Sequence, residues 1–191
     1  MGELILVTGG ARSGKSDFAE RLAVKLGGDE VLFVATAEAL DDDMARRIAA
    51  HRLARPTAWQ TLEAPQDVAK RLLPAIGTRR VVLIDCLTLL VSNTILTLGE
   101  SPDAPQAEAL VRHEVDELLA ATQATPATII VVTNEVGLGL VPMNTLGRVY
   151  RDALGRANQR LAAQADAVYA LLSGIALDIK RLASNLDDER D

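Results

Sequence analysis

Five short apolar runs alternate along the chain with longer stretches whose apolar positions recur at helical spacing. The short runs predict strands at residues 4–8, 31–36, 81–85, 128–134 and 167–172. The longer stretches predict helices at residues 16–26, 42–55, 66–75, 104–121 and 146–164. Strands that alternate with helices in this way indicate a largely parallel sheet with right-handed crossovers, and therefore an α/β fold.

A sixth run, at residues 175–180, differs because its apolar residues alternate with polar or small ones. It directly follows Ser173 and Gly174, a pair that favours a tight turn, so we expect an antiparallel edge strand near the C-terminus. Residues 97–105 include Pro102 and Pro105 and are predicted to form a loop that is too short to link two domains. We therefore expect a single domain over residues 1–191.

The amino-acid composition indicates which residues form the core, and the net charge indicates which class of partner is disfavoured. Hydrophobic residues make up 49% of the 191 residues and aromatic residues only 3%, so Ala, Val, Leu and Ile must supply the core. Such a core suits parallel strands that helices cover on both faces. The net charge of −6 disfavours a general nucleic-acid partner, which would require a basic face.

The number of cysteines indicates the redox state of the protein's compartment, and the longest uncharged stretch tests for a membrane span. The single cysteine, Cys86, excludes an intrachain disulfide, which suits a reducing cytoplasm, and we interpret it as a buried thiol rather than a reactive one. The uncharged stretch at 118–134 contains Gln123, Pro126 and four threonines. It is therefore predicted to be a helix end, a turn and a strand, and no membrane span is expected.

The first predicted strand leads into a glycine-rich segment that matches the pattern G-x-x-x-x-G-K-S. The segment is Gly9-Gly10-Ala11-Arg12-Ser13-Gly14-Lys15-Ser16, and a predicted helix follows it. In such a loop, backbone N–H groups and the helix N-terminus surround phosphate oxygens, and Lys15 would reach the β- and γ-phosphates. The alternative dinucleotide motif fails because Ala11 stands where its second glycine belongs. The pattern predicts a nucleoside triphosphate site in a three-layer α/β/α fold of the P-loop NTPase type.

The third predicted strand ends in a carboxylate, Asp85, as the Walker B segment of such proteins does. Asp85 and the Ser16 hydroxyl would then hold Mg²⁺ beside the phosphates. Many buried strands end in Asp for reasons of turn formation alone, but the preceding phosphate loop favours the metal-binding interpretation.

A basic stripe lies on the predicted second helix, where Arg47, His51 and Arg55 share one face. A nucleotide phosphate would relieve the repulsion among these cations. From the residues alone, His51 is better explained as a half-buried residue that extends the apolar stripe of Met44 and Ile48, and His113 as part of a solvated helix face. One residue of Asp41-Asp42-Asp43 is expected to cap this helix.

Several ordered segments together resemble one known family. They are Leu6-Val7-Thr8 with the phosphate loop, Ala35-Thr36-Ala37, Leu40-Asp41-Asp42-Asp43-Met44, Arg47-Ile48, His51-Arg52 with Arg55-Pro56, Asp85-Cys86-Leu87-Thr88, Thr133-Asn134-Glu135-Val136-Gly137, Val141-Pro142, Arg151-Asp152, Gly155-Arg156 and Asn158-Gln159-Arg160-Leu161. Over nearly the whole chain, this set is similar to the bifunctional adenosylcobinamide kinase / adenosylcobinamide-phosphate guanylyltransferase of cobalamin biosynthesis.

The resemblance implies two reactions and a set of site residues. A nucleoside triphosphate, ATP or GTP, phosphorylates adenosylcobinamide; GMP from GTP is then transferred through a GMP-histidine intermediate, for which only His51 matches the motif. The guanine nucleotide contacts it implies are Ala35, Thr36, Ala37, Glu63 and Asp85, and Arg52 and Arg55 would offset charge on the phosphoryl oxygens. For Glu63, an exposed carboxylate at a helix start is the competing interpretation. Relatives form trimers, so a homotrimer is implied as well.

The chain departs from the family pattern at two positions. Met143 stands where the family usually has Glu, and Leu138 replaces a residue that is often aromatic or Met. Glu135 either accepts the proton of the substrate hydroxyl or has a structural role, and residues 137–145 would close over a substrate. Two other functions stay open at this point: a monofunctional P-loop kinase for a small alcohol, and a nucleotide-gated regulatory protein without catalysis.

Overall fold

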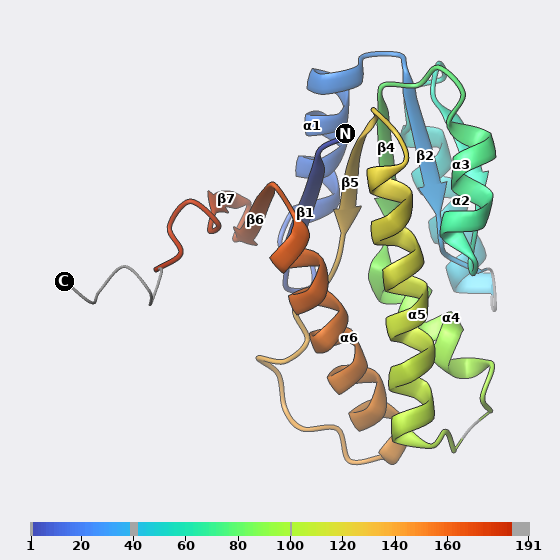
Figure 1. Cartoon of the computed structure of the whole chain (residues 1–191), viewed down its shortest axis with the longest axis vertical. Helices are drawn as coiled ribbons and strands as arrows, with labels where there is room; N and C mark the ends of the chain where they lie inside the picture. The colour runs from blue at the N-terminus through green and yellow to red at the C-terminus, as the bar shows by residue number, and fades with distance from the viewer. Residues whose placement is uncertain (1, 39–41, 100, 185–191) are drawn as a thin grey trace.

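The computed structural model describes residues 2–38, 42–99 and 101–184, which form a three-layer α/β/α structure (Figure 1). Seven strands of this described part pair in the order β3-β2-β4-β5-β1-β6-β7. The strands are β1 (Leu4–Gly9), β2 (Val31–Ala35), β3 (Gln60–Glu63), β4 (Val81–Asp85), β5 (Thr128–Val132), β6 (Ala167–Leu172) and β7 (Ile175–Asp178). Every neighbouring pair is parallel except β6 with β7, which is antiparallel. The mostly parallel sheet with an antiparallel edge is therefore confirmed.

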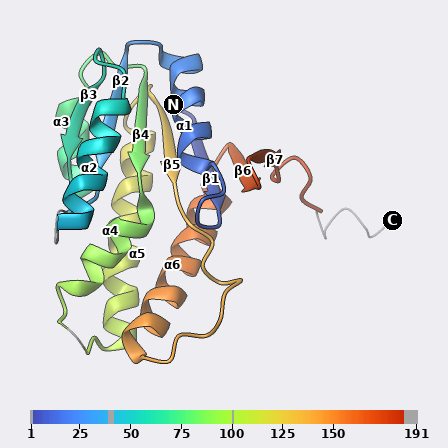
Figure 2. The ribbon, with the colours of Figure 1, turned by 180° about the vertical axis from the view of Figure 1, so that it is seen from behind.

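The helices cover the two faces of the sheet. They are α1 (Lys15–Gly27), α2 (Asp42–Ala54), α3 (Val68–Ile76), α4 (Leu87–Leu96), α5 (Ala104–Gln123) and α6 (Thr145–Gln164). Helices α1 and α2 lie on one face, and α3, α5 and α6 lie on the other (Figures 1 and 2). Helix α4 follows β4 and packs against α5 and α6.

The core consists of two apolar clusters, one on each face of the sheet, because successive strand residues point to opposite faces. Along β1, Leu4 and Leu6 pack toward α5 and α6, whereas Ile5 and Val7 pack toward α1. The central strands are buried on both faces, which explains their near-continuous runs of Val, Ile and Leu. Because β1, β2, β4 and β5 run parallel, their carboxyl ends meet at one edge of the sheet. Ligands of parallel sheets bind at this edge.

Two elements, β3 and α4, were not predicted from the sequence. β3 is an edge strand whose residues are mostly exposed, so it lacks an apolar run, and its parallel register with β2 comes from backbone pairing. Helix α4 is buried almost all round, including Asn93 and Thr94, so it lacks the polar face that marks an amphipathic helix. Residues 97–99 and 101–103, between α4 and α5, have no regular structure, as expected, but the predicted loop at 97–105 ends too late, because Ala104 and Pro105 begin α5.

The remaining observations concern where elements begin and end, and whether any helix could span a membrane. β5 ends at Val132 rather than at residue 134, and Asp103 caps α5 by accepting a hydrogen bond from the Gln106 N–H. Asp41, one candidate for the cap of α2, lies outside the described residues. Among the helices of the described chain, none has the length and apolarity that crossing a membrane requires.

Candidate active site

The phosphate loop connects β1 to α1 in a conformation that two glycines permit. Gly14 precedes α1 with φ of 88°, a left-handed conformation that suits glycine. Gly9 allows a close approach, because a Cβ there would lie 2.6 Å from Ser13 Oγ and 2.7 Å from the Leu171 carbonyl oxygen. No side chain caps the first turn of α1 in the described structure, so its N–H groups stay available to an anion.

Lys15 and Ser13 are arranged around the same loop. Lys15 Nζ donates to the Gly10 carbonyl at 3.3 Å, so the ammonium lies over the loop. The Ser13 carbonyl accepts a hydrogen bond of 3.0 Å from the Gly174 N–H, which ties the loop to the turn between β6 and β7. The sheet edge therefore supports the loop from the side opposite to α2. This geometry fits the expected triphosphate site, with Lys15 close to where the phosphates would lie.

A cavity of about 200 Å³ lies beside the loop, at the ends of β2 and β4. It brings together seven of the predicted site residues with several apolar neighbours. The lining residues are Ser16, Phe33, Ala35, Ala37, Ile48, His51, Arg55, Glu63, Asp85, Cys86 and Leu89. The helix carrying His51 and the loop carrying Ser16 thus face one another across a single cavity.

Asp85 and Ser16 converge at this cavity. Burial raises the pKa of the Asp85 carboxyl, while His51, a hydrogen bond from Ser16, and the charges of Lys15 and Arg55 act to lower it. A buried carboxylate and a hydroxyl at the end of a phosphate loop supply the hard oxygen ligands that Mg²⁺ prefers. The two residues therefore fit a divalent cation.

Arg55 is held over the ring of Phe33, with its guanidinium carbon 3.4 Å from the ring centroid. Its Nε and Nη1 atoms are buried and have no hydrogen-bond partner in the described part of the chain. Burial lowers the pKa of Arg55, and the nearby carboxylates of Asp85 and Glu20 oppose that effect. A half-buried guanidinium with two buried and unused donor atoms is well suited to bind a phosphate oxygen.

His51 is exposed and lines the cavity, so the structure disfavours the interpretation that it packs as a half-buried residue. The side chain of Arg47, the third member of the expected stripe, lies outside what the structure describes. His113 is exposed on α5 and pairs with Glu117, as expected for a solvated helix face. Cys86 is largely buried, and burial raises the pKa of its thiol to about 11, which agrees with an unreactive thiol.

Three other predicted residues occupy different settings. Thr36 is fully buried, and its hydroxyl both donates to the Cys86 carbonyl and accepts from the Cys86 N–H, each at 2.8 Å, so its side chain joins β2 to β4. Arg52 pairs with Glu63 and lines an adjoining hollow rather than the 200 Å³ cavity. Glu63 ends β3, so its interpretation as a helix-start carboxylate is wrong.

Glu20 lies near the cavity and was not predicted from the sequence to belong to its surroundings. Burial and the Asp85 charge raise the pKa of its carboxyl, whereas His51 and Arg55 lower it. Glu20 therefore lies in the same electrostatic environment as the predicted site. The signal was its position four residues after Ser16, which places both side chains on one face of α1.

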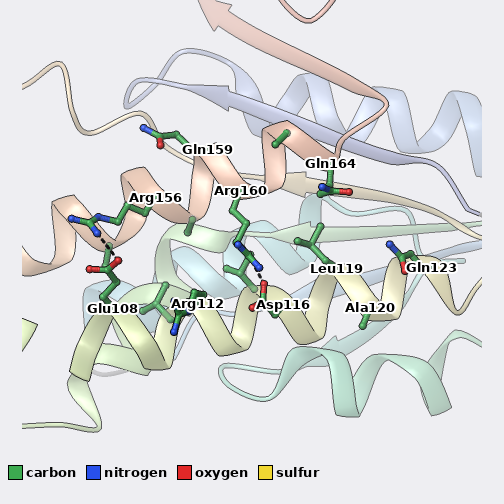
Figure 3. Close-up of a pocket in the computed structure, with 15 residues that line it drawn as sticks. Glu108, Arg112, Asp116, Leu119, Ala120, Gln123, Arg156, Gln159, Arg160 and Gln164 are labelled. Atoms are coloured by element: carbon green, nitrogen blue, oxygen red, sulfur yellow. Dashed lines mark hydrogen bonds and ion pairs between the residues drawn. The ribbon is translucent and has the colours of Figure 1, made fainter. Parts of the chain in front are cut away.

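A further hollow of about 650 Å³ lies between α5 and α6, and it contains none of the predicted site residues. The ion pairs Arg156–Glu108 and Arg160–Asp116 bridge it (Figure 3). Its floor consists of apolar residues of both helices, such as Val115 and Ala157. We interpret it as a surface groove between packed helices, separate from the phosphate loop.

Known proteins resemble this chain in fold and in sequence. The solved structure of an ATPase domain matches with a TM-score of 0.52 at 12% identity, covering 88% of this chain and 68% of that one, a likeness of fold alone. The "Bifunctional adenosylcobalamin biosynthesis protein CobU" of Escherichia coli (strain K12) is 44% identical over 93% of this chain and 99% of its own length. The corresponding CobP protein of Pseudomonas aeruginosa is 42% identical over 92% of this chain and 96% of its own. Residues 5–179 match the family "CobU: Cobinamide kinase / cobinamide phosphate guanyltransferase", and the chain belongs to that family.

Proposed function

We propose that this chain phosphorylates the hydroxyl of adenosylcobinamide with a nucleoside triphosphate and then transfers GMP from GTP to the resulting phosphate. The products are adenosylcobinamide-GDP and pyrophosphate. The observation that carries the proposal is the single cavity in which Ser16 of the phosphate loop faces His51, Arg55 and Asp85. Membership of the family supplies the identity of the substrates.

In the kinase reaction, the chain would act mainly by positioning and by charge. The acceptor oxygen bonds to the γ-phosphorus, the bond from that phosphorus to the β,γ-bridging oxygen breaks, and the nucleoside diphosphate leaves. Lys15 and the N–H groups at the start of α1 would hold the β- and γ-phosphates and offset their charge. Mg²⁺ bound to Ser16 and Asp85 would neutralise charge on the phosphates.

In the GMP transfer, His51 would be the nucleophile. A neutral imidazole nitrogen attacks the α-phosphorus, pyrophosphate leaves, and a phosphorus–nitrogen bond forms. A phosphate oxygen of the cobinamide phosphate then attacks the same phosphorus, and His51 is released. Arg55 would donate to the α-phosphoryl oxygens through its unused Nε and Nη1, and Arg52 would add positive charge nearby.

The remaining predicted contacts concern the guanine nucleotide and its surroundings. Ala35 and Ala37 line the cavity together with Glu63, so the nucleoside would lie along the ends of β2 and β3. Thr36 would contribute through its backbone, because its hydroxyl is already bonded to Cys86. A cytoplasmic location suits the single buried thiol, and a homotrimer is expected from the resemblance.

Labelled GTP tests the proposal directly. Protein, Mg²⁺ and GTP labelled at the α-phosphate, or at the γ-phosphate in a parallel sample, are incubated, denatured and examined for label bound to protein. We expect acid-labile, alkali-stable α-label, lost in His51→Ala and retained in His113→Ala, the matched change at the other histidine. When adenosylcobinamide is added to the γ-labelled sample, the γ-label should move to it.

The opposite result separates the alternatives. If no α-label stays on the protein while γ-phosphate still reaches an alcohol, the chain is a monofunctional kinase and His51 has no covalent role. If neither label is transferred and the nucleotide is only bound, a regulatory protein is the better description.

A further inference from the structure

A second hollow meets the phosphate loop from the opposite face of the sheet. It has a volume of about 510 Å³ and is formed by β1, the segment after β5, α6 and β6. Its lining residues are Leu6, Thr8, Glu135, Gly137, Arg151, Asp152, Gly155, Arg156, Asn158, Gln159, Ala162, Val168 and Ile179. It shares no lining residue with the cavity that contains His51.

The hollow reaches the phosphate loop at its first glycine. Thr8, which lines the hollow, immediately precedes Gly9, and the Glu135 N–H donates to the Gly9 carbonyl at 3.1 Å. A ligand in this hollow would therefore approach the loop from the α6 face, whereas the cavity with His51 lies on the α1 and α2 face. Two different ligands can thus meet at the phosphates without competing for one space.

The charges of the lining favour a neutral ligand over a second nucleotide. Arg151 pairs with Asp152 at 3.3 Å, and Arg156 pairs with Glu108 across the α5–α6 groove (Figure 3). Both guanidinium groups are therefore partly satisfied within the protein. Glu135 has no ion-pair partner among the described residues, so its carboxylate would repel an anion and attract a hydroxyl or amide donor.

Hydrogen-bonding capacity remains unused inside the hollow. Thr8 Oγ1 is buried and has no partner in the described part of the chain. Figure 3 shows Gln159 pointing away from α5, and the same residue lines the hollow. Hydroxyl and amide side chains of this kind suit a ligand that carries hydroxyl and amide groups.

A hydrogen-bond network fixes the segment that carries Glu135. Thr133 Oγ1 lies 2.7 Å from Asn158 Oδ1, and Asn158 Nδ2 donates to the Asn134 carbonyl at 3.0 Å. The Asn134 N–H in turn donates to Thr88 Oγ1 of α4 at 3.0 Å. Glu135 accepts from the Gly137 N–H at 2.8 Å, so its carboxylate is held against the start of the following loop, while its backbone N–H is bonded to the Gly9 carbonyl.

The following loop displays large apolar side chains to solvent. Leu138, Leu140 and Met143 are 89%, 97% and 94% exposed. Arg148 donates to the Pro142 and Met143 carbonyls at 3.2 and 2.8 Å, so the end of this loop is anchored to α6. An exposed apolar patch beside a hollow of mixed apolar and hydrogen-bonding residues is typical of a ligand-binding surface.

We infer that the 510 Å³ hollow binds the hydroxyl-bearing arm of the corrinoid acceptor, and that the apolar loop residues Leu138, Leu140 and Met143 contact its macrocycle. This inference rests on the proposed function. Glu135 accepts the proton of the hydroxyl as its oxygen bonds to the γ-phosphorus and the nucleoside diphosphate leaves. The two departures from the family pattern, Leu138 and Met143, then lie on the acceptor surface and leave the nucleotide cavity unchanged.

The test separates acceptor binding from nucleotide chemistry. Equilibrium dialysis with dicyanocobinamide measures corrinoid affinity for the wild type, for Leu138→Ser with Met143→Ser, and for Leu73→Ser, a control at an exposed leucine of α3. We expect the double variant to bind at least about tenfold more weakly, because the changes remove apolar contact area. The control should bind as the wild type does. In all three proteins, GTP affinity and α-label incorporation without corrinoid should stay within about twofold of each other.

A second variant addresses Glu135. Glu135→Gln keeps an oxygen that can accept from the Gly137 N–H but cannot take a proton, so γ-phosphate transfer to adenosylcobinamide should slow by about 100-fold or more while corrinoid affinity stays within about threefold. If transfer and affinity in these variants equal those of the wild type, the inference is wrong although the proposed function stands. If the wild type itself binds GTP but phosphorylates no corrinoid, the proposed function fails, and the inference fails with it.

Discussion

At the residue scale, burial disfavours the charged carboxylate of Asp85, although a metal ion would bind that same charged form. Asp85 ends a buried strand, and burial raises the pKa of its carboxyl although His51, Lys15 and Arg55 partly compensate. Without a bound cation, the charged form of Asp85 is therefore less favourable in the folded chain than in the unfolded one. Carboxylates with a perturbed pKa are typical of functional sites. A cation bound at Asp85 would favour the charged form again.

The pH dependence of stability tests this account of Asp85. Because the folded pKa is raised, the folded chain binds more protons than the unfolded one between the ordinary and the raised pKa, so Asp85 loses stabilising effect as pH rises through that window. Without nucleotide or metal, Asp85→Asn should melt at a higher temperature than the wild type at pH values of about 7–8. The difference should shrink as pH falls toward about 4.

A control and a contrary result complete that experiment. Asp29→Asn changes an exposed carboxylate and should follow the wild-type melting curve at every pH. If Asp85→Asn is less stable than the wild type at the alkaline end of that range without metal, the carboxylate is a structural partner rather than a strained ligand. Loss of Mg²⁺-dependent stabilisation by GTP in Asp85→Asn would support the metal role independently.

The site could be predicted only where the residues carry a local pattern. Ser16 and Asp85 follow from the phosphate loop and from a strand ending in Asp, and His51 follows from the resemblance. Glu20 could have been placed beside Ser16 from its helical spacing, but its nearness to Asp85, His51 and Arg55 could not be predicted, and neither could the stacking of Arg55 on Phe33. These contacts join segments that are far apart in the sequence, and no local pattern in either segment predicts them.

At the element scale, the same reasoning explains which parts of the fold were predictable. Central strands such as β4 and β5 are buried on both faces and show as continuous apolar runs. β3 joins the sheet through backbone pairing at the edge, so its sequence has little reason to be apolar. Helix α4 is enclosed by α5, α6 and the sheet, so nearly all of its side chains are buried. Its sequence therefore has no polar face, and helix prediction depends on such a face.

The start of α1 offers a prediction with an internal control. Gly14→Ala should destabilise the fold by about 1–2 kcal/mol, because its left-handed conformation is costly for a residue with a Cβ. Gly155→Ala, in the interior of α6 with no atom within 4 Å of the new Cβ, should instead stabilise by about 1 kcal/mol. Urea unfolding monitored by circular dichroism measures both changes. Equal effects of the two variants would show that the conformation of Gly14 is not the cause.

At the scale of the whole molecule, the phosphate loop stands between two hollows on opposite faces of one sheet. Such an arrangement suits two reactions that share phosphate chemistry, since the acceptor and the histidine can each approach the loop from their own side. The loop is also tied to the sheet edge through the Gly174 N–H and the Ser13 carbonyl. Whatever contacts that edge is therefore coupled by hydrogen bonding to the triphosphate site.

If the chain forms the homotrimer that the resemblance implies, we expect that edge to be its interface. Figures 1 and 2 show β6 and β7 at the edge of the sheet. Leu172 and Ile175 face each other in the β6–β7 register and are both exposed, as are Leu177, Ile179 and Leu182 farther along. An unpaired edge strand with an apolar face is an unfavourable surface in a monomer.

Light scattering after size-exclusion chromatography should therefore give three times the chain mass for the wild type and for Val24→Ser, a control on α1. Leu172→Ser with Ile175→Ser should give smaller species and weaker GTP binding, since the turn that holds Ser13 lies between the two substitutions. A monomeric wild type at all concentrations, or a trimer unaffected by the double substitution, would place the oligomer or its interface elsewhere.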